Sequence, residues 1–154
     1  MGIRKMLKKE TDKQNYSILA GERAILQILK EIDKAENRER IEVEIQKLLE
    51  VLGNYGNAER TYVFETVHAP ETFTNTYEWC ADGIVAQKDN LQDVRFEEIP
   101  CWVKEFRQGE SVVVNNIEDI CYTMPLEYEL LKMQAIKSVI VLPLFHGSDL
   151  IGFL

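Results

Sequence analysis

The spacing of apolar residues changes along the chain, from a helical period to a strand period. Over residues 17–35, apolar side chains recur at steps of three, four and seven, which is the spacing of one helix face. A second stretch follows Asn37, a residue suited to an N-cap, and its apolar positions alternate at steps of four and three as far as Tyr55. Gly53 and Gly56 are expected to end this helix. The N-terminal part is therefore predicted to contain two helices.

Beyond the second helix, the pattern takes a period of two. Residues 61–65 and 72–81 are rich in aromatic and β-branched side chains, and a turn around Pro70 separates them. These features predict two neighbouring strands. Residues 84–101 show no clear period and are predicted to form a long connection.

Two short helices and three more strands are predicted in the remainder. Helices are expected to begin at Pro100 and Pro125, because proline favours the first helical position. Strands are expected at residues 111–114, 138–145 and 150–154, and the last two read as a hairpin. Short loops between neighbouring strands favour an antiparallel sheet, so the predicted class is α+β. The second short helix is expected to carry Leu126, Leu130 and Met133 spaced along one face.

The two ends of the chain differ from the rest. Residues 1–16 are expected to form a basic arm ahead of a single domain at residues 17–154. The last strand stops at Leu154 without a turn residue or a polar tail, so we expect the sequence to be a fragment cut within that strand.

Charge and composition exclude several classes of partner. The net charge is −8, which argues against binding to a nucleic-acid backbone. No run of 18 apolar residues occurs, so no membrane insertion is expected. Three cysteines without a Cys-x-x-Cys pair predict neither a metal site nor a disulfide framework, and this usage fits a reducing cytoplasm.

Candidate chemistry in the sequence is sparse. Cys101 is the candidate reactive thiol, because it opens a predicted helix and a helix N-terminus can lower a thiol pKa. Ordinary packing is the alternative for Cys101 and for Cys80. His68 and His146 lie in or beside turns and are expected to be solvated. There is no Gly-rich phosphate loop and no Ser/His/Asp arrangement.

Several segments, taken in order, resemble the GAF domain. They are Glu59-Arg-Thr-Tyr-Val-Phe-Glu65, Asn75-Thr-Tyr-Glu-Trp-Cys80 followed by Asp82-Gly83, Ile99-Pro-Cys-Trp102, Phe106-Arg-Gln-Gly-Glu110, and Tyr128 to Ser138 leading into Val139-Ile-Val-Leu-Pro-Leu-Phe145 and Leu150-Ile-Gly-Phe-Leu154. The resemblance covers roughly residues 22–154. It is to the bacterial subgroup found beside cyclic-di-GMP enzymes (GGDEF/EAL domains) and histidine kinases.

The resemblance implies a fold and a role. The expected fold is a five-stranded antiparallel sheet in the order 2-1-5-4-3, with N-terminal helices on one face and short helices on the other. The C-terminal helix of the family would be missing. The expected role is that of a non-catalytic, cytoplasmic signal-transduction sensor that binds a small molecule or dimerises to control an output domain. A purely structural dimerisation unit is the alternative, and a GAF-fold thiol reductase such as free methionine-(R)-sulfoxide reductase is a third.

The resemblance also places the candidate site residues. The ligand would bind between the sheet and the short helices, and the candidate pocket residues are Tyr62, Phe64, Trp79, Trp102, Phe106, Met124 and Leu130. The expected homodimer contact is the first helix, through Ile18, Ile25, Ile28 and Ile32. The sequence departs from cyclic-nucleotide-binding members, since it lacks Asn-Lys-x-Phe-Asp-Glu. It also lacks the Cys-His pair that attaches a bilin. No metal site is predicted, and the identity of the ligand or cofactor is left open.

Overall fold

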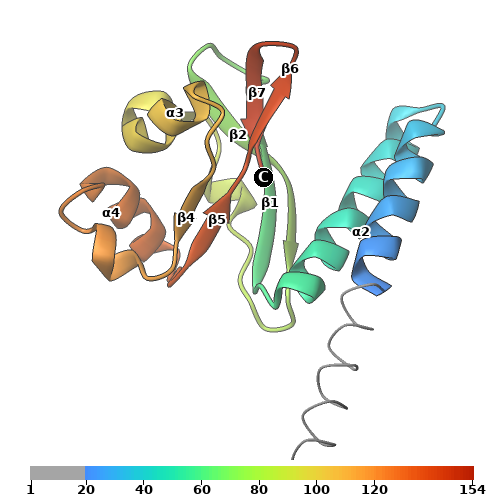
Figure 1. Cartoon of the computed structure of the whole chain (residues 1–154), viewed down its shortest axis with the longest axis horizontal. Coiled ribbons are helices and arrows are strands. Elements are labelled where there is room, and N and C mark those ends of the chain that lie inside the picture. The colour runs from blue at the N-terminus through green and yellow to red at the C-terminus, as the bar shows by residue number, and fades with distance from the viewer. Residues whose placement is uncertain (1–19) are drawn as a thin grey trace, which may run out of the picture. The chain divides into compact units, whose positions relative to one another are not determined.

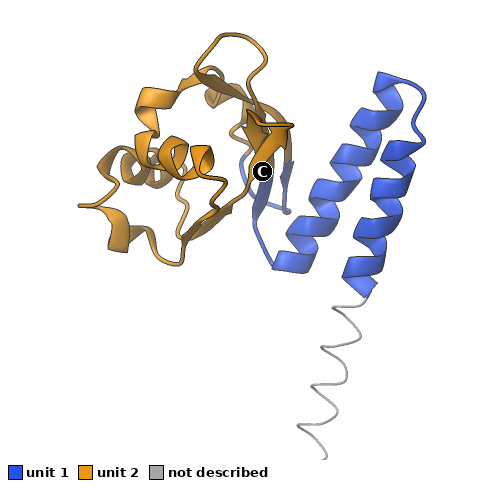
Figure 2. Cartoon of the chain, turned by 45° about the horizontal axis from the view of Figure 1, so that its top comes forward, with its two compact units in different colours: residues 1–61, 79–85 blue, residues 62–78, 86–154 orange. Residues whose placement is uncertain are grey.

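The structure is a computed structural model that describes residues 20–154, and it divides into two compact units. The described part of unit 1 comprises residues 20–61 and 79–85, and unit 2 comprises residues 62–78 and 86–154 (Figure 2). The predicted basic arm and Ile18 lie outside the described residues.

Unit 1 contains a helical hairpin. Residues 20–33 form the described part of the first helix, and α2 runs from Arg38 to Gly56. The two helices lie side by side (Figures 1 and 2). The predicted N-cap is confirmed, because the Asn37 side chain accepts a hydrogen bond from the backbone N–H of Arg40 at 2.9 Å.

The predicted end of α2 is correct for Gly56 but not for Gly53. The helix continues through Gly53, its last residue is Gly56, and the C-cap is Asn57, which takes the left-handed conformation with φ of 50°. Asparagine tolerates this conformation better than most residues, so it can replace glycine as the cap. Gly53 has a different role: it is buried, and the ring of Trp79 occupies the space that a Cβ would need.

The sheet has the predicted strand order. Strands β3 (Val94–Arg95), β2 (Thr72–Cys80), β1 (Arg60–Glu65), β7 (Asp149–Phe153) and β6 (Pro143–His146) are neighbours in that order, and β4 (Val112–Val114) pairs antiparallel with β5 (Val139–Val141). The predicted fourth strand is thus divided into β5 and β6. Leu142 lies between them and exchanges two backbone hydrogen bonds with Leu154, of 2.8 and 2.9 Å. The order 2-1-5-4-3 is therefore confirmed, with β3 added beside β2.

The connection predicted over residues 84–101 has structure of its own. It contains a 3₁₀ turn, η1 (Lys88–Asn90), then β3, then a second turn, η2 (Phe96–Glu98). Its start is fixed by the Glu78 carboxylate, which accepts hydrogen bonds from the backbone N–H groups of Gln87 and Lys88 at 2.7–3.0 Å. A further 3₁₀ turn, η3 (Ile117–Ile120), precedes the second short helix.

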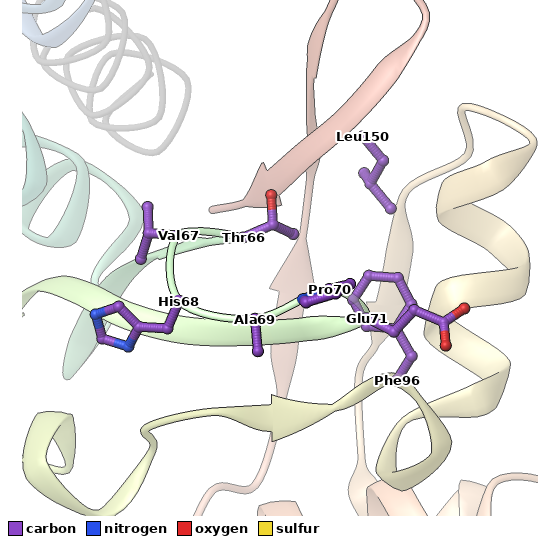
Figure 3. A pocket seen from close by; sticks show the side chains of 8 residues that line it. All are labelled: Thr66, Val67, His68, Ala69, Pro70, Glu71, Phe96 and Leu150. Carbon is purple, nitrogen blue, oxygen red and sulfur yellow. The ribbon is translucent and has the colours of Figure 1, made fainter.

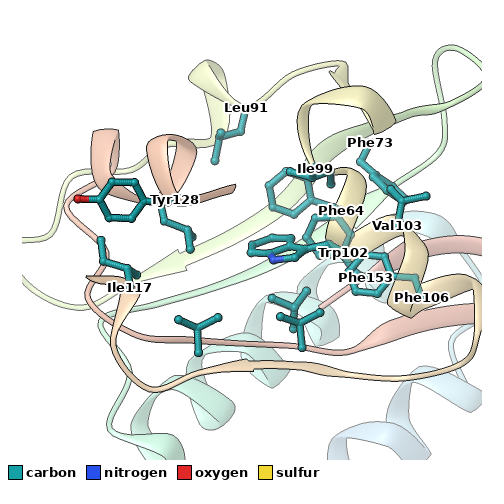
Figure 4. Close-up of a cluster of buried hydrophobic side chains, with 14 residues drawn as sticks. Phe64, Phe73, Leu91, Ile99, Trp102, Val103, Phe106, Ile117, Tyr128 and Phe153 are labelled. Atoms are coloured by element: carbon teal, nitrogen blue, oxygen red, sulfur yellow. The ribbon is translucent and has the colours of Figure 1, made fainter. Parts of the chain in front are cut away.

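The core of unit 2 lies between the sheet and two short helices, α3 (Pro100–Arg107) and α4 (Pro125–Met133) (Figures 1 and 4). Aromatic rings from strands and helix meet at its centre. The Phe73 ring lies 4.9 Å from that of Phe153 and 6.4 Å from that of Phe106, measured between centroids. Both helices therefore cover the same face of the sheet.

The face of α4 that carries the spaced apolar residues is mostly exposed. Leu126 and Met133 are 51% and 77% exposed, and Leu130 is half-buried. The helix instead buries Glu127, Tyr128 and Leu131. Two of these carry polar groups that find partners inside the fold, which is why hydropathy alone did not identify them.

The outer surface of β4 carries an exposed apolar pair. Val113 is paired across the strands with Ile140, and the two residues are 59% and 65% exposed. On its other side, β4 pairs with no strand in the part of the chain that the structure describes.

Candidate functional site

A small cavity of about 50 Å³ lies within unit 2, between the sheet and the short helices. Four of the seven predicted pocket residues line it: Tyr62 and Phe64 from β1, Trp102 from α3 and Leu130 from α4. Figure 4 shows the Phe64 and Trp102 side chains together in the buried cluster. The structure thus brings these four residues together where the prediction placed a pocket.

The other three predicted pocket residues lie elsewhere. Phe106 is fully buried in the core. Met124 precedes α4 and packs against the core from a half-buried position. Trp79 belongs to unit 1, where its ring lies against Gly53. None of these three lines the cavity.

Sequence reasoning missed several lining residues. Leu91 and Val94 come from the connection that was read as irregular, and Gln134 follows the end of α4. Phe153 was assigned to a strand but not to the site. A signal existed for Val94, an apolar residue within a polar stretch, but its place in β3 depends on pairing with Phe73.

The polar groups of the cavity are few. The Tyr62 hydroxyl donates a hydrogen bond to Oε1 of Gln134 at 3.2 Å, and Nε2 of Gln134 donates one to the Leu130 carbonyl at 3.0 Å. The Nε1 atom of Trp102 is buried and has no hydrogen-bond partner among the described residues. No charged side chain from the described part of the chain lines the cavity.

Glu127 fixes the helix that carries Trp102. Its side chain is fully buried, and Oε1 accepts hydrogen bonds from the backbone N–H groups of Cys101 and Trp102 at 2.6 and 3.3 Å. These N–H groups belong to the first turn of α3, where helix donors lack an internal partner and a negative charge is favoured. The carboxylate thereby holds α4 against the start of α3.

The same carboxylate reverses the expectation for Cys101. Burial raises the pKa of the Cys101 thiol, and the nearby Glu127 carboxylate raises this pKa further. The predicted lowering by the helix N-terminus is therefore wrong, because Glu127 already occupies that position. Cys80 ends β2 and Cys121 packs half-buried against the core, and none of the three cysteines lines the cavity.

A second, open groove of about 440 Å³ follows the turn after β1 (Figure 3). It is lined by residues of that turn together with Phe96 and Leu150. His68 at its rim is not simply solvated: its Nδ1 lies 3.2 Å from Oδ1 of Asp93 and 3.3 Å from Oγ1 of Thr74. These contacts join the turn to β2 and to the segment before β3, so they have a structural explanation.

Residues 20–154 lack the features of two other kinds of site. No cluster of three metal-ligating His, Cys, Asp or Glu residues occurs among residues 20–154. Over the same residues, no helix combines the length and apolar character that crossing a membrane requires.

The candidate dimer contact is partly covered in unit 1. Ile25, Ile28 and Ile32 are half-buried, whereas Leu26 and Leu29 of the same helix are 58% and 46% exposed. No second copy of the chain is present to test the contact, so dimerisation through this helix stays a prediction.

The family of the chain follows from a comparison with family models. The model described as the GAF domain matches residues 40–154, which is most of the chain. This chain belongs to the GAF domain family. A comparison of this GAF domain with curated proteins gave no match.

Solved structures with the same fold include bilin-bound photoreceptors. A phycocyanobilin-bound GAF domain from a cyanobacterial phytochrome gives a TM-score of 0.68 at 14% identity, covering 86% of this chain and 76% of its own. The far-red absorbing dark state of JSC1_58120g3 with bound biliverdin gives 0.62 at 17% identity, covering 84% and 79%. The GAF domain of the cyanobacteriochrome TePixJ gives 0.58 at 19% identity, covering 77% and 71%. These likenesses establish a shared fold.

Proposed function

We propose that this GAF domain is a non-catalytic sensory module that binds a small molecule in the cavity beside Trp102. The observation that carries the proposal is the cavity itself, which is lined by side chains from both the sheet and the short helices. A ligand there would contact β1, β7, α3 and α4 at once. It would stabilise whichever arrangement of these elements fits it best, and so shift their equilibrium.

The proposed ligand is smaller than a bilin and is bound without a covalent bond. The fold neighbours hold bilins, but the cavity here has a volume of only about 50 Å³. A cavity that holds benzene measures about 150 Å³. None of the three cysteines lines the cavity, so a covalent attachment there lacks a thiol.

The proposed signal reaches an output domain in a longer cytoplasmic protein. The sequence resemblance suggests that this output domain is a cyclic-di-GMP enzyme or a histidine kinase in a bacterial signalling protein. The first helix would carry the signal by pairing with its copy in a homodimer, through Ile18, Ile25, Ile28 and Ile32. The exposed Leu26 and Leu29 of this helix add apolar surface that such a contact could bury.

A screen of thermal stability tests the binding proposal. The chain would be heated with metabolites, nucleotides and bilins in separate wells, and a specific ligand should raise the melting temperature in a saturating manner. Leu130→Trp places a larger ring in the cavity wall, so it should abolish the ligand-induced rise in melting temperature. The melting temperature of the ligand-free variant should fall by less than that rise. A library in which no compound gives a saturating shift would contradict the proposal.

A second candidate function is a purely structural dimerisation module. The small volume of the cavity favours it, because side chains of the domain already occupy most of the space. This candidate predicts a dimer whose stability is the same with every compound in the screen. Ile25→Glu combined with Ile32→Glu would convert that dimer to a monomer, as measured by light scattering.

The thiol reductase alternative has less support. A reductase needs a thiolate near neutral pH. Burial and Glu127 raise the pKa of Cys101, which keeps its thiol protonated. We therefore propose that this domain has no catalytic activity of its own.

A further inference from the structure

We infer that the cavity takes a small, uncharged and mostly apolar molecule, and that its single hydrogen-bond acceptor binds the indole N–H of Trp102. The inference rests on the proposed function, because it concerns the same cavity and names the class of ligand. Cyclic ketones, lactones and esters belong to this class.

The walls of the cavity disfavour an ion. Among the described lining residues only Tyr62, Trp102 and Gln134 carry a polar side-chain atom, and none of the lining side chains carries a charge. A carboxylate, phosphate or ammonium group would lose its hydration there without gaining a counter-charge, which is strongly unfavourable. Nucleotides and other acidic ligands are thereby disfavoured.

Among the described residues that line the cavity, Trp102 supplies a buried polar group that still needs a partner. Its Nε1 atom is buried and unpaired among the described residues, and an indole nitrogen is a donor only. A buried donor without an acceptor is destabilising, so a ligand acceptor at this position gains the hydrogen bond without any further desolvation of the indole, and it offsets part of its own desolvation. The other two polar side chains already bond within the domain, Tyr62 to Gln134 and Gln134 to the Leu130 carbonyl. One acceptor on an otherwise apolar ligand therefore matches the site.

The volume of the cavity limits the size of the ligand. The present cavity, at about 50 Å³, is smaller than the roughly 150 Å³ that holds a benzene ring. Leu130, Val94 and Ile136 are half-buried lining residues, so rotation of their side chains can enlarge the cavity without unpacking the core. A single five- or six-membered ring is the largest ligand that such a change would admit.

Three probes of similar size test the inference on the whole 154-residue chain. They are cyclopentanone, its isostere methylenecyclopentane, which lacks the acceptor, and the anion cyclopentanecarboxylate. The chain contains two tryptophans, so NMR of the ¹⁵N-labelled protein shows two indole N–H peaks, assigned with Trp79→Phe and Trp102→Phe. Cyclopentanone should move the Trp102 peak in a saturating manner and leave the Trp79 peak in place.

Affinities separate the hydrogen bond from simple filling of the cavity. The quantity to measure is the ratio of the dissociation constants of cyclopentanone and methylenecyclopentane, because only the ketone gives up hydrogen bonds to water when it enters the cavity; the carboxylate should not bind. In Trp102→Phe, followed through the backbone amide of Val141, this ratio should shift roughly tenfold against the ketone. Tyr62→Phe is the matched control and should leave the ratio unchanged, because the Tyr62 hydroxyl is already bonded to Gln134.

Each other outcome overturns the inference, and some leave the proposed function standing. A ratio of the two dissociation constants that is the same in Trp102→Phe as in the unchanged chain would remove the role of Trp102 while supporting a ligand cavity. Tighter binding of the carboxylate would reverse the assigned ligand class. If no probe binds, the ligand class is wrong, and the thermal screen described above then decides separately whether the domain binds any small molecule.

Discussion

The two ends of the buried sheet face in unit 2 differ in how completely they are packed. At one end Phe73 is fully buried, and its ring stacks at 4.5 Å on Phe96. At the other end Trp102 lines a cavity and has an unpaired Nε1. Phe153 belongs to both ends, since its ring meets that of Phe73 at 4.9 Å and that of Trp102 at 6.2 Å. A closed core and an adaptable site can therefore share one strand, and the type of aromatic residue does not distinguish them.

The largest effect should come from opening the packed end. Phe73→Ala removes a fully buried ring that contacts three other rings, and it should lower the free energy of unfolding by about 3–5 kcal/mol. Leu130→Ala at the cavity should cost much less, about 1–2 kcal/mol, because Leu130 is half-buried and borders empty space. Urea denaturation of both variants measures the difference. Equal losses would mean that the two ends are packed alike.

A smaller but still large effect should come from the strand that the two ends share. Gly152 of β7 is buried where it pairs with Glu65 of β1, and a Cβ there would collide with the backbone carbonyl of Phe64. Gly152→Ala should therefore destabilise the domain by about 3 kcal/mol, since backbone rather than a side chain must move.

Gly56→Ala is the matched control for Gly152→Ala. Open space surrounds Gly56 in α2, so this change should stabilise the domain by about 0.5–1 kcal/mol. Melting temperatures that fall for both variants, or rise for both, would contradict this assignment.

The smallest effect concerns ionisation beside the open end. Glu127→Gln keeps an oxygen acceptor for the first turn of α3 but removes the charge that raises the pKa of the Cys101 thiol. The pKa should fall, so alkylation of Cys101 by iodoacetamide should reach its half-maximal rate at a lower pH. Mass spectrometry of the Cys101 peptide gives the profile, with the Cys80 peptide as an internal reference.

The sign of the linked stability follows from the same shift. A thiol whose pKa is raised in the folded state favours folding at acidic and neutral pH, and this contribution is lost as the pH rises through the folded-state pKa. Glu127→Gln should weaken that alkaline loss. Glu105→Gln is the control, because Glu105 is the smallest of the causes that raise the pKa of Cys101. A profile that is unchanged in Glu127→Gln would show that burial alone sets the pKa.

Elements with strong local signals could be predicted from the sequence. The start of α3 at Pro100 and its buried Trp102, Val103 and Phe106 follow from proline preference and helical spacing. The N-cap at Asn37 and the order of the main strands were also correct. In each case the deciding information lies within a few residues or in the family pattern.

Features that depend on distant partners could not be predicted. β3 has only two residues and exists because it pairs with the start of β2. The buried face of α4 includes Glu127, which becomes favourable only when it meets the N–H groups of α3. Trp79 looked like Trp102 in sequence, but Gly53 gives its ring a place in unit 1. Tertiary contacts therefore determine which residues line the cavity where sequence patterns do not.

The bare side of β4 has a consequence for handling concentrated solutions. A three-valine strand with an edge that pairs with no strand of residues 20–154, beside the exposed pair Val113 and Ile140, is a template on which strands of other molecules can add. Attraction between molecules through this edge should outweigh their charge repulsion once salt screens the net charge of −8. The domain should accordingly remain monodisperse at low ionic strength or with the substitution Val113→Lys.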